Sequence, residues 1–239
     1  MSDILQKPVL LTGASGNIGR FLAKTLADAG WTLRLSDLAP YPGPLPPRAT
    51  FARVDLAQGL EVMRLAEGCG LILHFGGASH DLWPFEDIVN GNLRGTYHIY
   101  EAARRERARV VFASTNHVTG FHERTTKLDS DCELRPDSLY GVSKAYGELL
   151  AKLYWMKHGV ESVCVRIGSC FPEPSTARML SLWFSYEDLG RLMIKCGGAE
   201  TVGYKIIWGV SNNSRSFWGR DARAELGWTP QDSADGHAE

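Results

Sequence analysis

A glycine-rich turn near the start of the chain limits the possible folds more than any other feature. The apolar run Pro8-Val-Leu-Leu-Thr12 has strand character and leads directly to Gly13, Gly16 and Gly19, after which a helical pattern begins. A strand, a glycine turn and a helix in this order form a dinucleotide-binding unit, because glycines let the backbone approach a pyrophosphate at the helix N-terminus. The spacing G-x-x-G-x-x-G differs from the tighter G-x-G-x-x-G of the usual fingerprint.

Acidic residues follow at the ends of the next two strand-like runs. Asp37 comes about twenty residues after the glycine turn, where a carboxylate can accept hydrogen bonds from the adenosine ribose. The same charge repels the additional phosphate of NADP, and the neighbouring Leu38 offers no arginine to bind it. We therefore expect NAD as the cofactor. Asp55 and Leu56, after the run 50–54, are expected to contact the adenine.

Strand-like and helical patterns alternate along the chain, which predicts a parallel sheet. We expect strands near 8–12, 31–36, 50–54, 70–75, 109–113, 161–167 and 204–208, and helices near 17–30, 58–68, 85–107, 138–158, 185–196 and 220–226. The proline-rich stretch 40–47 indicates a surface connection, and the polar tail 231–239 is expected to fray.

No internal repeat or interdomain linker interrupts this pattern. We therefore predict one Rossmann-like domain over 1–239, a doubly wound α/β parallel sheet with a small C-terminal substrate-binding portion. The substrate-binding elements are expected mainly in 166–230. With 239 residues and 44% hydrophobic content, the chain can bury a substantial core.

Charge and cysteine content narrow the class of protein. The formal net charge of -1 predicts neither a nucleic-acid nor an anionic-membrane surface. No apolar stretch has the length of a membrane span, and the N-terminus lacks a signal-peptide layout. Five scattered cysteines without a C-x-x-C spacing favour reduced thiols in the cytoplasm, and we expect no metal site. Arginines at 104, 105, 107 and 109 are expected on a solvated face.

The segment Tyr140-Gly-Val-Ser-Lys144 carries the strongest catalytic signal. Residues at i and i+4 share a helix face, so both side chains can point into one cleft. A lysine cation beside a tyrosine favours the phenolate and lowers its pKa, which predicts Tyr140 as a general base for oxidation of an alcohol. Thr115 lies 25 residues earlier, directly after a predicted strand whose carboxyl end should face the nicotinamide.

The glycine turn together with Thr115, Tyr140 and Lys144 resembles the extended branch of the short-chain dehydrogenase/reductase superfamily. This resemblance implies that Thr115 holds the substrate oxygen, Tyr140 moves the proton, and Lys144 binds the nicotinamide ribose while tuning Tyr140. His74-Phe-Gly-Gly-Ala-Ser79 matches a glycine-rich strand end that faces the cofactor, and Asn92 is expected either to contact the cofactor or to stabilise the local structure. The implied cofactor-binding residues are Gly13, Gly16, Asn17, Ile18, Gly19, Asp37, Leu38, Asp55, Leu56, Phe75, Gly76, Gly77, Asn92, Tyr140, Lys144 and Ile167.

A longer motif narrows the resemblance. The segment Arg166-Ile-Gly-Ser-Cys-Phe-Pro-Glu-Pro174 with Arg178-Met-Leu-Ser-Leu-Trp-Phe-Ser185 is similar to the uronate dehydrogenases, which belong to the NAD-dependent epimerase/dehydratase superfamily. The resemblance implies oxidation of the anomeric carbon of D-glucuronate or D-galacturonate to the aldarolactone. Arg178 would bind the carboxylate bidentately. The implied substrate-binding residues are Ser79, Thr115, Asn116, His117, Tyr140, Ser169 and Arg178.

Several of these roles have structural alternatives. Arg178 would be occupied if it formed an ion pair with Glu173 or Asp188. His117 and Ser169 would be structural if they only bonded loop backbone. Two departures from the family pattern also stand out: Thr115 replaces a serine, and the chain stops soon after Pro230, which we expect to affect activity or substrate preference if the family's further residues shape the pocket.

Two other functions stay open. One is an epimerase or dehydratase of nucleotide sugars, although the portion after strand 161–167 is short for a nucleotide-binding lobe. The other is an NAD-binding sensor without catalysis, although such proteins commonly lose the Tyr/Lys pair. We expect a homo-oligomer packed through helices 85–107 and 138–158. The preference between the two uronates, the anomer used and the number of subunits are not encoded in any motif that we find.

Overall fold

The computed structural model describes residues 3–123 and 125–237, and its centre is a parallel seven-stranded sheet. The strands are β1 (Val9–Thr12), β2 (Leu33–Asp37), β3 (Ala49–Arg53), β4 (Leu71–His74), β5 (Arg109–Thr115), β6 (Ser162–Ile167) and β9 (Tyr204–Gly209). Their order is β3-β2-β1-β4-β5-β6-β9, and all six pairings are parallel. The strand order reverses between β1 and β4, which confirms the predicted doubly wound, Rossmann-like fold.

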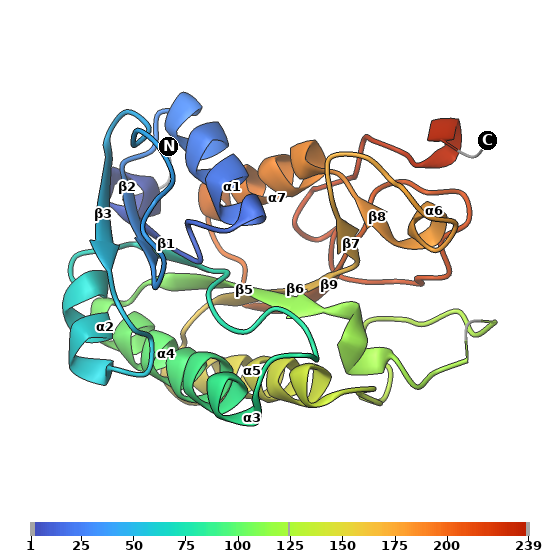
Figure 1. Cartoon of the computed structure of the whole chain (residues 1–239), viewed down its shortest axis with the longest axis horizontal. Coiled ribbons are helices and arrows are strands. Elements are labelled where there is room, and N and C mark those ends of the chain that lie inside the picture. The colour runs from blue at the N-terminus through green and yellow to red at the C-terminus, as the bar shows by residue number, and fades with distance from the viewer. Residues whose placement is uncertain (1–2, 124, 238–239) are drawn as a thin grey trace.

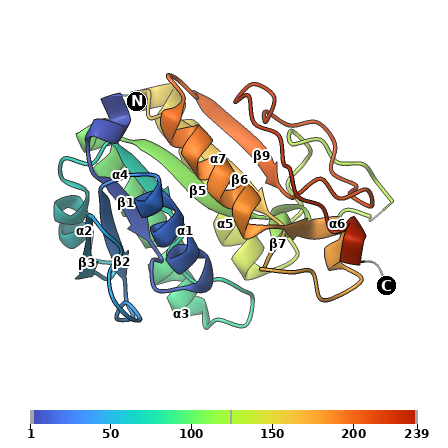
Figure 2. The ribbon, with the colours of Figure 1, turned by 90° about the horizontal axis from the view of Figure 1, so that it is seen from above.

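Helices cover both faces of this sheet (Figure 1). One face carries α1 (Asn17–Asp28) and α7 (Tyr186–Gly198), which contact each other and lie side by side over the strands in Figure 2. The other face carries α2 (Gly59–Ala66), α4 (Gly95–Glu106) and α5 (Leu139–His158). All five lie close to their predicted ranges, except that the single helix expected over 85–107 is interrupted.

Side-chain alternation along the strands fills two cores. In β1, Val9 and Leu11 pack into the core under α1 and α7, whereas Leu10 packs into the core under α2, α4 and α5. Because successive side chains of a strand point to opposite faces, an uninterrupted apolar run is what a sheet buried on both faces requires. The central strands therefore have fixed positions, and so do the loops at their carboxyl ends.

Local capping fixes where the two helices nearest these loops begin. The Ser138 hydroxyl accepts a hydrogen bond from the Gly141 N–H at 3.0 Å and starts α5, so Tyr140 lies in its first turn. The Ser185 hydroxyl accepts one from the Asp188 N–H at 2.9 Å and starts α7. Each cap satisfies a backbone N–H that has no partner within the helix.

The expected helix over 85–107 consists of three pieces. A short α3 (Phe85–Asp87) leads into a π-helical segment, η2 (Ile88–Arg94), before α4 begins. A β-carbon on Gly91 would come within 3.3 Å of the Gly77 Cα, so this segment packs closely on the loop after β4. π-helical turns are frequent at functional sites, and periodicity alone does not reveal them.

A small C-terminal layer completes the fold with β7 (Ser169–Cys170), α6 (Met179–Leu182) and β8 (Trp183–Phe184). Trp208 and Trp218 stack with ring centroids 4.1 Å apart in its core. The helix predicted over 220–226 is wrong, because these residues form turns. The Asp221 carboxylate accepts hydrogen bonds from the backbone N–H groups of Trp208 and Arg223, which favours a turn over a helix.

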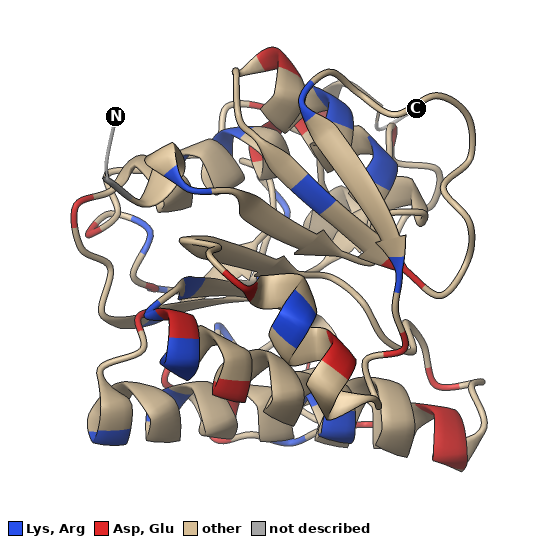
Figure 3. Cartoon of the chain, turned by 90° about the vertical axis from the view of Figure 1, so that its left-hand side faces the viewer, with Lys and Arg blue, Asp and Glu red and all other residues tan. Residues whose placement is uncertain are grey.

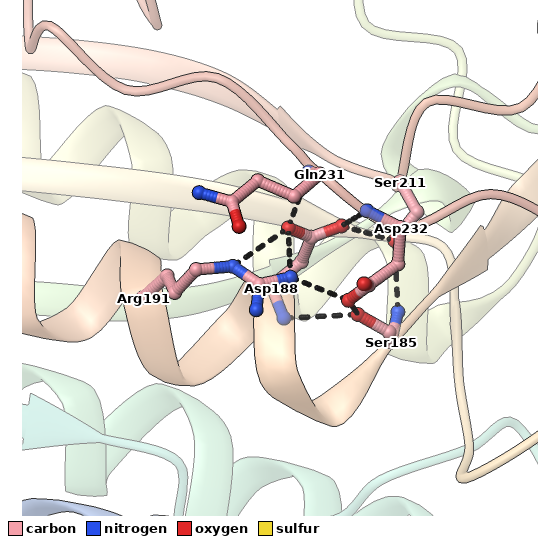
Figure 4. Close-up of polar contacts among 6 residues, drawn as sticks. All are labelled: Ser185, Asp188, Arg191, Ser211, Gln231 and Asp232. Atoms are coloured by element: carbon pink, nitrogen blue, oxygen red, sulfur yellow. Dashed lines mark hydrogen bonds and ion pairs between the residues drawn. The ribbon is translucent and has the colours of Figure 1, made fainter.

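The expectation that the tail from Gln231 onward frays is wrong for its first residues. The backbone N–H groups of Gln231 and Asp232 donate to the fully buried Asp188 carboxylate at 2.8 and 3.1 Å (Figure 4). Arg191 bridges Asp188 and Asp232. Residues 40–47, by contrast, contain no helix or strand, as expected.

Arg109 also differs from expectation. Its side chain is buried in β5 and donates to the Glu161 carboxylate and to the carbonyl oxygens of Cys196 and Ala199.

On the side of the molecule shown in Figure 3, acidic and basic residues are interspersed along the helices. None of the helices in the described part of the chain combines the length and the apolar character of a membrane span.

Candidate active site

The glycine turn forms a backbone cradle between β1 and α1. Gly13 has φ +73°, and a β-carbon there would lie 2.6 Å from the Phe75 carbonyl carbon. A β-carbon on Gly19 would lie 2.0 Å from the Gly13 oxygen, whereas Gly16 has room. Gly16 caps α1 without a side-chain hydrogen bond. The first N–H groups of the helix and its positive dipole end therefore face the groove, which suits a pyrophosphate.

One end of the groove is a cavity of about 470 Å³ beside β2 and β3. The Asp37 carboxylate accepts hydrogen bonds from the backbone N–H groups of Ser15 and Ala39 at 2.9 and 3.1 Å. These bonds hold the carboxylate at the edge of the cavity, where its remaining lone pairs can accept hydrogen bonds from hydroxyl groups. The other predicted residues that line this end are Leu38, Asp55, Leu56 and Gly76.

Three residues that line this end were not among the predicted site residues. Trp83, Asp87 and Asn90 also line the cavity, from the loop and helical turns after β4. The indole of Trp83 is 42% exposed and contacts the His80 ring. Their role depends on how this loop folds back over the sheet edge, which no local motif encodes.

A second cavity of about 480 Å³ continues the groove past β4 to β5 and β6. Both cavities share Gly13, Gly16, Phe75, Gly77 and Ser79, so they form one groove along the carboxyl edge of the sheet. The remaining predicted residues that line the second cavity are Asn17, Ile18, Gly19, Thr115, Asn116, His117, Tyr140, Lys144, Ile167, Ser169 and Arg178. Every predicted site residue except Asn92 therefore lines one of the two cavities.

Asn92 is buried and lines neither cavity. Its side-chain amide donates to the Ala78 oxygen at 3.1 Å and to the Ser143 hydroxyl at 2.8 Å. It thus links η2 to the loop after β4 and to α5, which is the structural one of its two expected roles. The placement of Asn92 among the cofactor-contacting residues is not supported by the cavity lining.

Tyr140 and Thr115 form the centre of the second cavity. Both side chains line this cavity and are largely buried. Burial raises the pKa of Tyr140 to about 12, and the Thr115 hydroxyl opposes this rise. The expectation of a lowered Tyr140 pKa is therefore wrong, because the cost of desolvating the phenolate outweighs its stabilisation by neighbouring groups.

Lys144 is fully desolvated next to Tyr140. Its ammonium lies 5.0 Å from the centroid of the Phe112 ring and 5.8 Å from that of Tyr140. Burial lowers the pKa of Lys144 to about 8, so the side chain is still mainly protonated at neutral pH. Burial and this cation lower the pKa of His74 to about 3, which leaves His74 neutral and hydrogen-bonded to Thr12 and Thr96.

Polar side chains surround the outer part of the same cavity. The His117 ring bonds the Asp137 carboxylate at 2.8 Å and lies edge-on to Tyr140, with centroids 5.8 Å apart. This bond orients the imidazole, so His117 does more than bond loop backbone. Ser169 lies in β7, which pairs with β8 and thereby holds the hydroxyl-bearing loop beside β6.

Arg178 is available for an anion. Its expected competitor Asp188 is occupied by Arg191, Ser211 and the tail backbone, and no ion pair joins Arg178 to Glu173 among the described residues. Arg178 is exposed at the start of α6 and lines the second cavity. A guanidinium at this position can donate two parallel hydrogen bonds to a carboxylate.

Arg166, the first residue of the long motif, has a structural role that the sequence did not reveal. It forms a buried bidentate pair with Glu148, with N–O distances of 2.9 and 2.8 Å, and its guanidinium lies 5.0 Å from the Trp208 ring centroid. Ser114 donates to the same carboxylate at 2.6 Å. The pair joins β6, α5 and the C-terminal layer beneath the site. Tyr186, also unpredicted, lines the cavity from α7.

Residues 9–197 match the NAD dependent epimerase/dehydratase family. The chain belongs to this family. It is 44% identical to a uronate dehydrogenase from Pseudomonas syringae pv. tomato over 95% of its own length and 82% of that protein. It is 32% identical to an NAD-dependent glucose-6-phosphate dehydrogenase from Haloferax volcanii, over 96% and 95% of the two chains.

Solved structures agree with these relatives. A crystal structure of uronate dehydrogenase from Agrobacterium tumefaciens matches with a TM-score of 0.92 at 44% identity, covering 96% of this chain and 86% of that one. A tyrosine-to-alanine variant of the same enzyme, crystallised with NAD, matches with the same TM-score. The protein is therefore an NAD-dependent oxidoreductase of the uronate dehydrogenase type, and the glycine cradle, Asp37 and Lys144 fit this cofactor.

Within the described residues, no group of three or more His, Cys, Asp or Glu side chains is arranged to hold a metal ion. All five cysteines are free thiols, and four of them are buried.

Proposed function

We propose that this enzyme oxidises the anomeric carbon of a hexuronate, D-glucuronate or D-galacturonate, to the aldarolactone with NAD. The observation that carries the proposal is one cavity lined by Thr115, Tyr140 and Arg178, and Arg178 forms no ion pair among the described residues. Thr115 and Tyr140 suit a hydroxyl that loses a proton, and the arginine suits an anion at the other end of the same small molecule. Their shared cavity continues into the nucleotide groove.

In this mechanism Thr115 and Tyr140 hold the C1 hydroxyl. Tyr140, as the phenolate, takes the hydroxyl proton while the C1–H bond breaks. NAD held by the glycine cradle and Asp37 would accept the hydride and would add a positive charge to the site. Because burial holds the pKa of Tyr140 near 12 in spite of Thr115, the Lys144 ammonium and that further charge must together stabilise the phenolate.

Arg178 binds the carboxylate and thereby sets which end of the sugar faces Tyr140. Ser79, Asn116, His117 and Ser169 line the cavity between the two ends and offer hydrogen bonds to the ring hydroxyls. The product is a lactone because the ring oxygen is already bonded to C1. Oxidation there converts a hemiacetal directly into an ester, and no further group is needed.

The assembly proposed with this function is a homo-oligomer. The side chains of Val142, Leu149, Leu153 and Met156 recur at helical spacing along α5 and are between 49% and 74% exposed. A stripe of this kind commonly packs against another helix. Leu153→Glu should then lower the molar mass measured by light scattering, and an unchanged mass would reject this face.

The free thiols favour the reducing cytoplasm as the compartment of the enzyme.

The decisive experiment measures NADH formation with glucuronate and galacturonate. We expect turnover by the parent and a loss of about 10²- to 10⁴-fold in kcat for Tyr140→Phe, because the general base is removed. Arg178→Ala should mainly raise the KM for the uronate, by about tenfold or more, since a charged hydrogen-bonded pair is lost. Titration calorimetry with NAD serves as the control for folding: both variants should retain NAD binding, and Arg178→Ala should bind NAD as the parent does.

Glucose 6-phosphate belongs in the same experiment, because Arg178 would also accept a phosphate at C6. Turnover of the sugar phosphate in preference to both uronates would replace the proposed substrate but keep the catalytic residues. NAD binding without turnover of any of the three would favour a sensor.

A further inference from the structure

A third cavity lies directly outside the second one, between the loop after β5 and the C-terminal layer. Its volume is about 470 Å³, close to that of the second cavity. The two share Asn116, His117 and Arg178, so these three residues form the boundary between an inner and an outer chamber. The proposed reaction uses the inner chamber alone and leaves the outer one without a role.

The walls of the outer chamber have the chemistry of a sugar site. Phe217 and Trp218 lie at its wall with ring centroids 4.4 Å apart and an interplanar angle of 42°. Hydroxyl groups come from Thr119 and Ser181, and an imidazole comes from His122. Aromatic surface with a few polar groups is typical of small-molecule sites, and it offers both the apolar faces and the hydroxyls of a pyranose a partner.

The direction in which a bound uronate lies connects the two chambers. With C1 at Tyr140 and the carboxylate at Arg178, the carbon that bears the carboxylate, C5, lies toward the outer chamber. C4 is next to C5 and opposite C1 across the six-membered ring. A substituent on the C4 oxygen therefore leaves the inner chamber beside Arg178, where the outer chamber begins.

We propose that the outer chamber binds the second sugar of a 4-linked oligouronide, so that the enzyme also oxidises the reducing end of such chains. This inference rests on the proposed function and extends its substrate class. The reaction is unchanged: one proton leaves the C1 hydroxyl, one hydride leaves C1 for NAD, and the C1–O bond becomes a carbonyl. The glycosidic bond at the C4 oxygen is not broken, and the product is a chain that ends in a lactone.

The test compares galacturonate with its 4-linked dimer as substrates for the full chain. NADH formation gives the rate, and mass spectrometry identifies the product as the intact dimer less two hydrogens, which excludes monomer contamination. Ser181→Trp narrows the outer chamber without changing the inner one, because Ser181 lines only the outer chamber. We expect it to lower kcat/KM for the dimer at least about tenfold and to leave the monomer rate unchanged. Ala177→Trp is a second variant at the same wall, for use if the first does not fold.

The possible failures differ from one another. An enzyme that oxidises the monomer but not the dimer overturns this inference and leaves the proposed function intact. A folded Ser181→Trp variant whose kcat/KM falls equally for the monomer and the dimer also overturns it, since the chamber would then serve the monomer. If neither substrate is oxidised, the proposed function fails and the inference falls with it.

Discussion

The two ends of the groove are built in different ways. At the nucleotide end, backbone and glycines provide the surface, and the main polar side chain is Asp37, held by two backbone N–H groups. At the substrate end, side chains from separate segments meet, including Thr115 after β5, Tyr140 in α5 and Arg178 before α6. One end depends on the absence of side chains, and the other depends on their identity.

This difference determines what each end tolerates. A backbone cradle fails when any β-carbon enters it, whatever the chemistry of the new residue. A side-chain site fails when one functional group is lost, even if the shape is kept. Mutations at the two ends should therefore be separable into effects on folding, on NAD binding and on turnover.

The largest effect is expected at Gly19. A β-carbon there would meet the Gly13 oxygen at 2.0 Å, so Gly19→Ala must displace backbone and should cost at least about 3 kcal/mol of unfolding free energy. Gly16→Ala meets nothing closer than 3.4 Å and should fold normally, yet it should weaken NAD binding about tenfold or more because its methyl group enters the groove. Urea unfolding and calorimetry separate the two.

Equal stability of the two variants would contradict this division of the cradle into a packing glycine and a cofactor-facing one. Gly198→Ala is the matched control, since a β-carbon there has nothing within 4 Å. It should leave both the stability and NAD binding unchanged.

Lys144 lines the second cavity, and it should show a conflict between stability and activity. Its pKa is about 8 in the folded protein, against 10.5 for an unperturbed lysine as in the unfolded chain. Keeping the ammonium buried at pH 7 therefore lowers the free energy of unfolding by about 3 kcal/mol. Lys144→Met should remove that cost and raise the unfolding midpoint by several degrees. It should also abolish turnover, because Tyr140 loses its cation.

The stability gained by Lys144→Met should depend on pH. Between pH 8 and 10.5 the unfolded parent binds a proton that the folded parent has lost, so the stability of the parent rises with pH across this window. The gain of Lys144→Met should therefore be full below pH 8 and vanish by pH 10.5. Lys24→Met, at an exposed lysine, should show neither change. A variant that is less stable than the parent at pH 7 would show that Lys144 is not strained by burial.

The same contrast explains how much could be predicted from the sequence. The glycine turn, Asp37 and the strands follow from patterns within a few residues of one another, and the structure places them as expected. Tyr140 and Lys144 are one helical turn apart, so their shared cavity also followed from local spacing. The predicted lowering of the Tyr140 pKa was wrong, because burial by surrounding elements is not encoded in the motif.

Long-range partners account for the other errors. Arg109 is buried because Glu161 and carbonyls near residue 199 reach it across the sheet. Residues 220–226 form turns because Asp221 bonds the backbone of β9. In each case the deciding contact joins residues distant in sequence, and the chain alone gives no sign of it. Arg178 was singled out as a site residue only through family resemblance.

The smallest effect is expected in the network that joins the tail to α7 (Figure 4). Arg191 pairs with Asp188 and Asp232, and this network surrounds the first turn of α7, where Tyr186 reaches the substrate cavity. Arg191 is partly exposed, and Asp188 keeps its bonds from Ser211 and the tail backbone without it. Arg191→Met should therefore cost only about 1 kcal/mol of unfolding free energy.

The sharper readout is kinetic. Loosening the first turn of α7 should raise the KM for the uronate about two- to threefold and leave the dissociation constant of NAD unchanged, because Tyr186 in this turn lines the second cavity and not the one beside β2 and β3. Arg104→Met is the matched control, since Arg104 forms the same i,i+3 pair with Glu101 on the opposite layer of helices, and it should change neither constant. A shift in NAD affinity with Arg191→Met would show that the two ends are mechanically coupled through α7 and α1, which contact each other. The division between a backbone end and a side-chain end would then hold for their chemistry but not for their response to mutation.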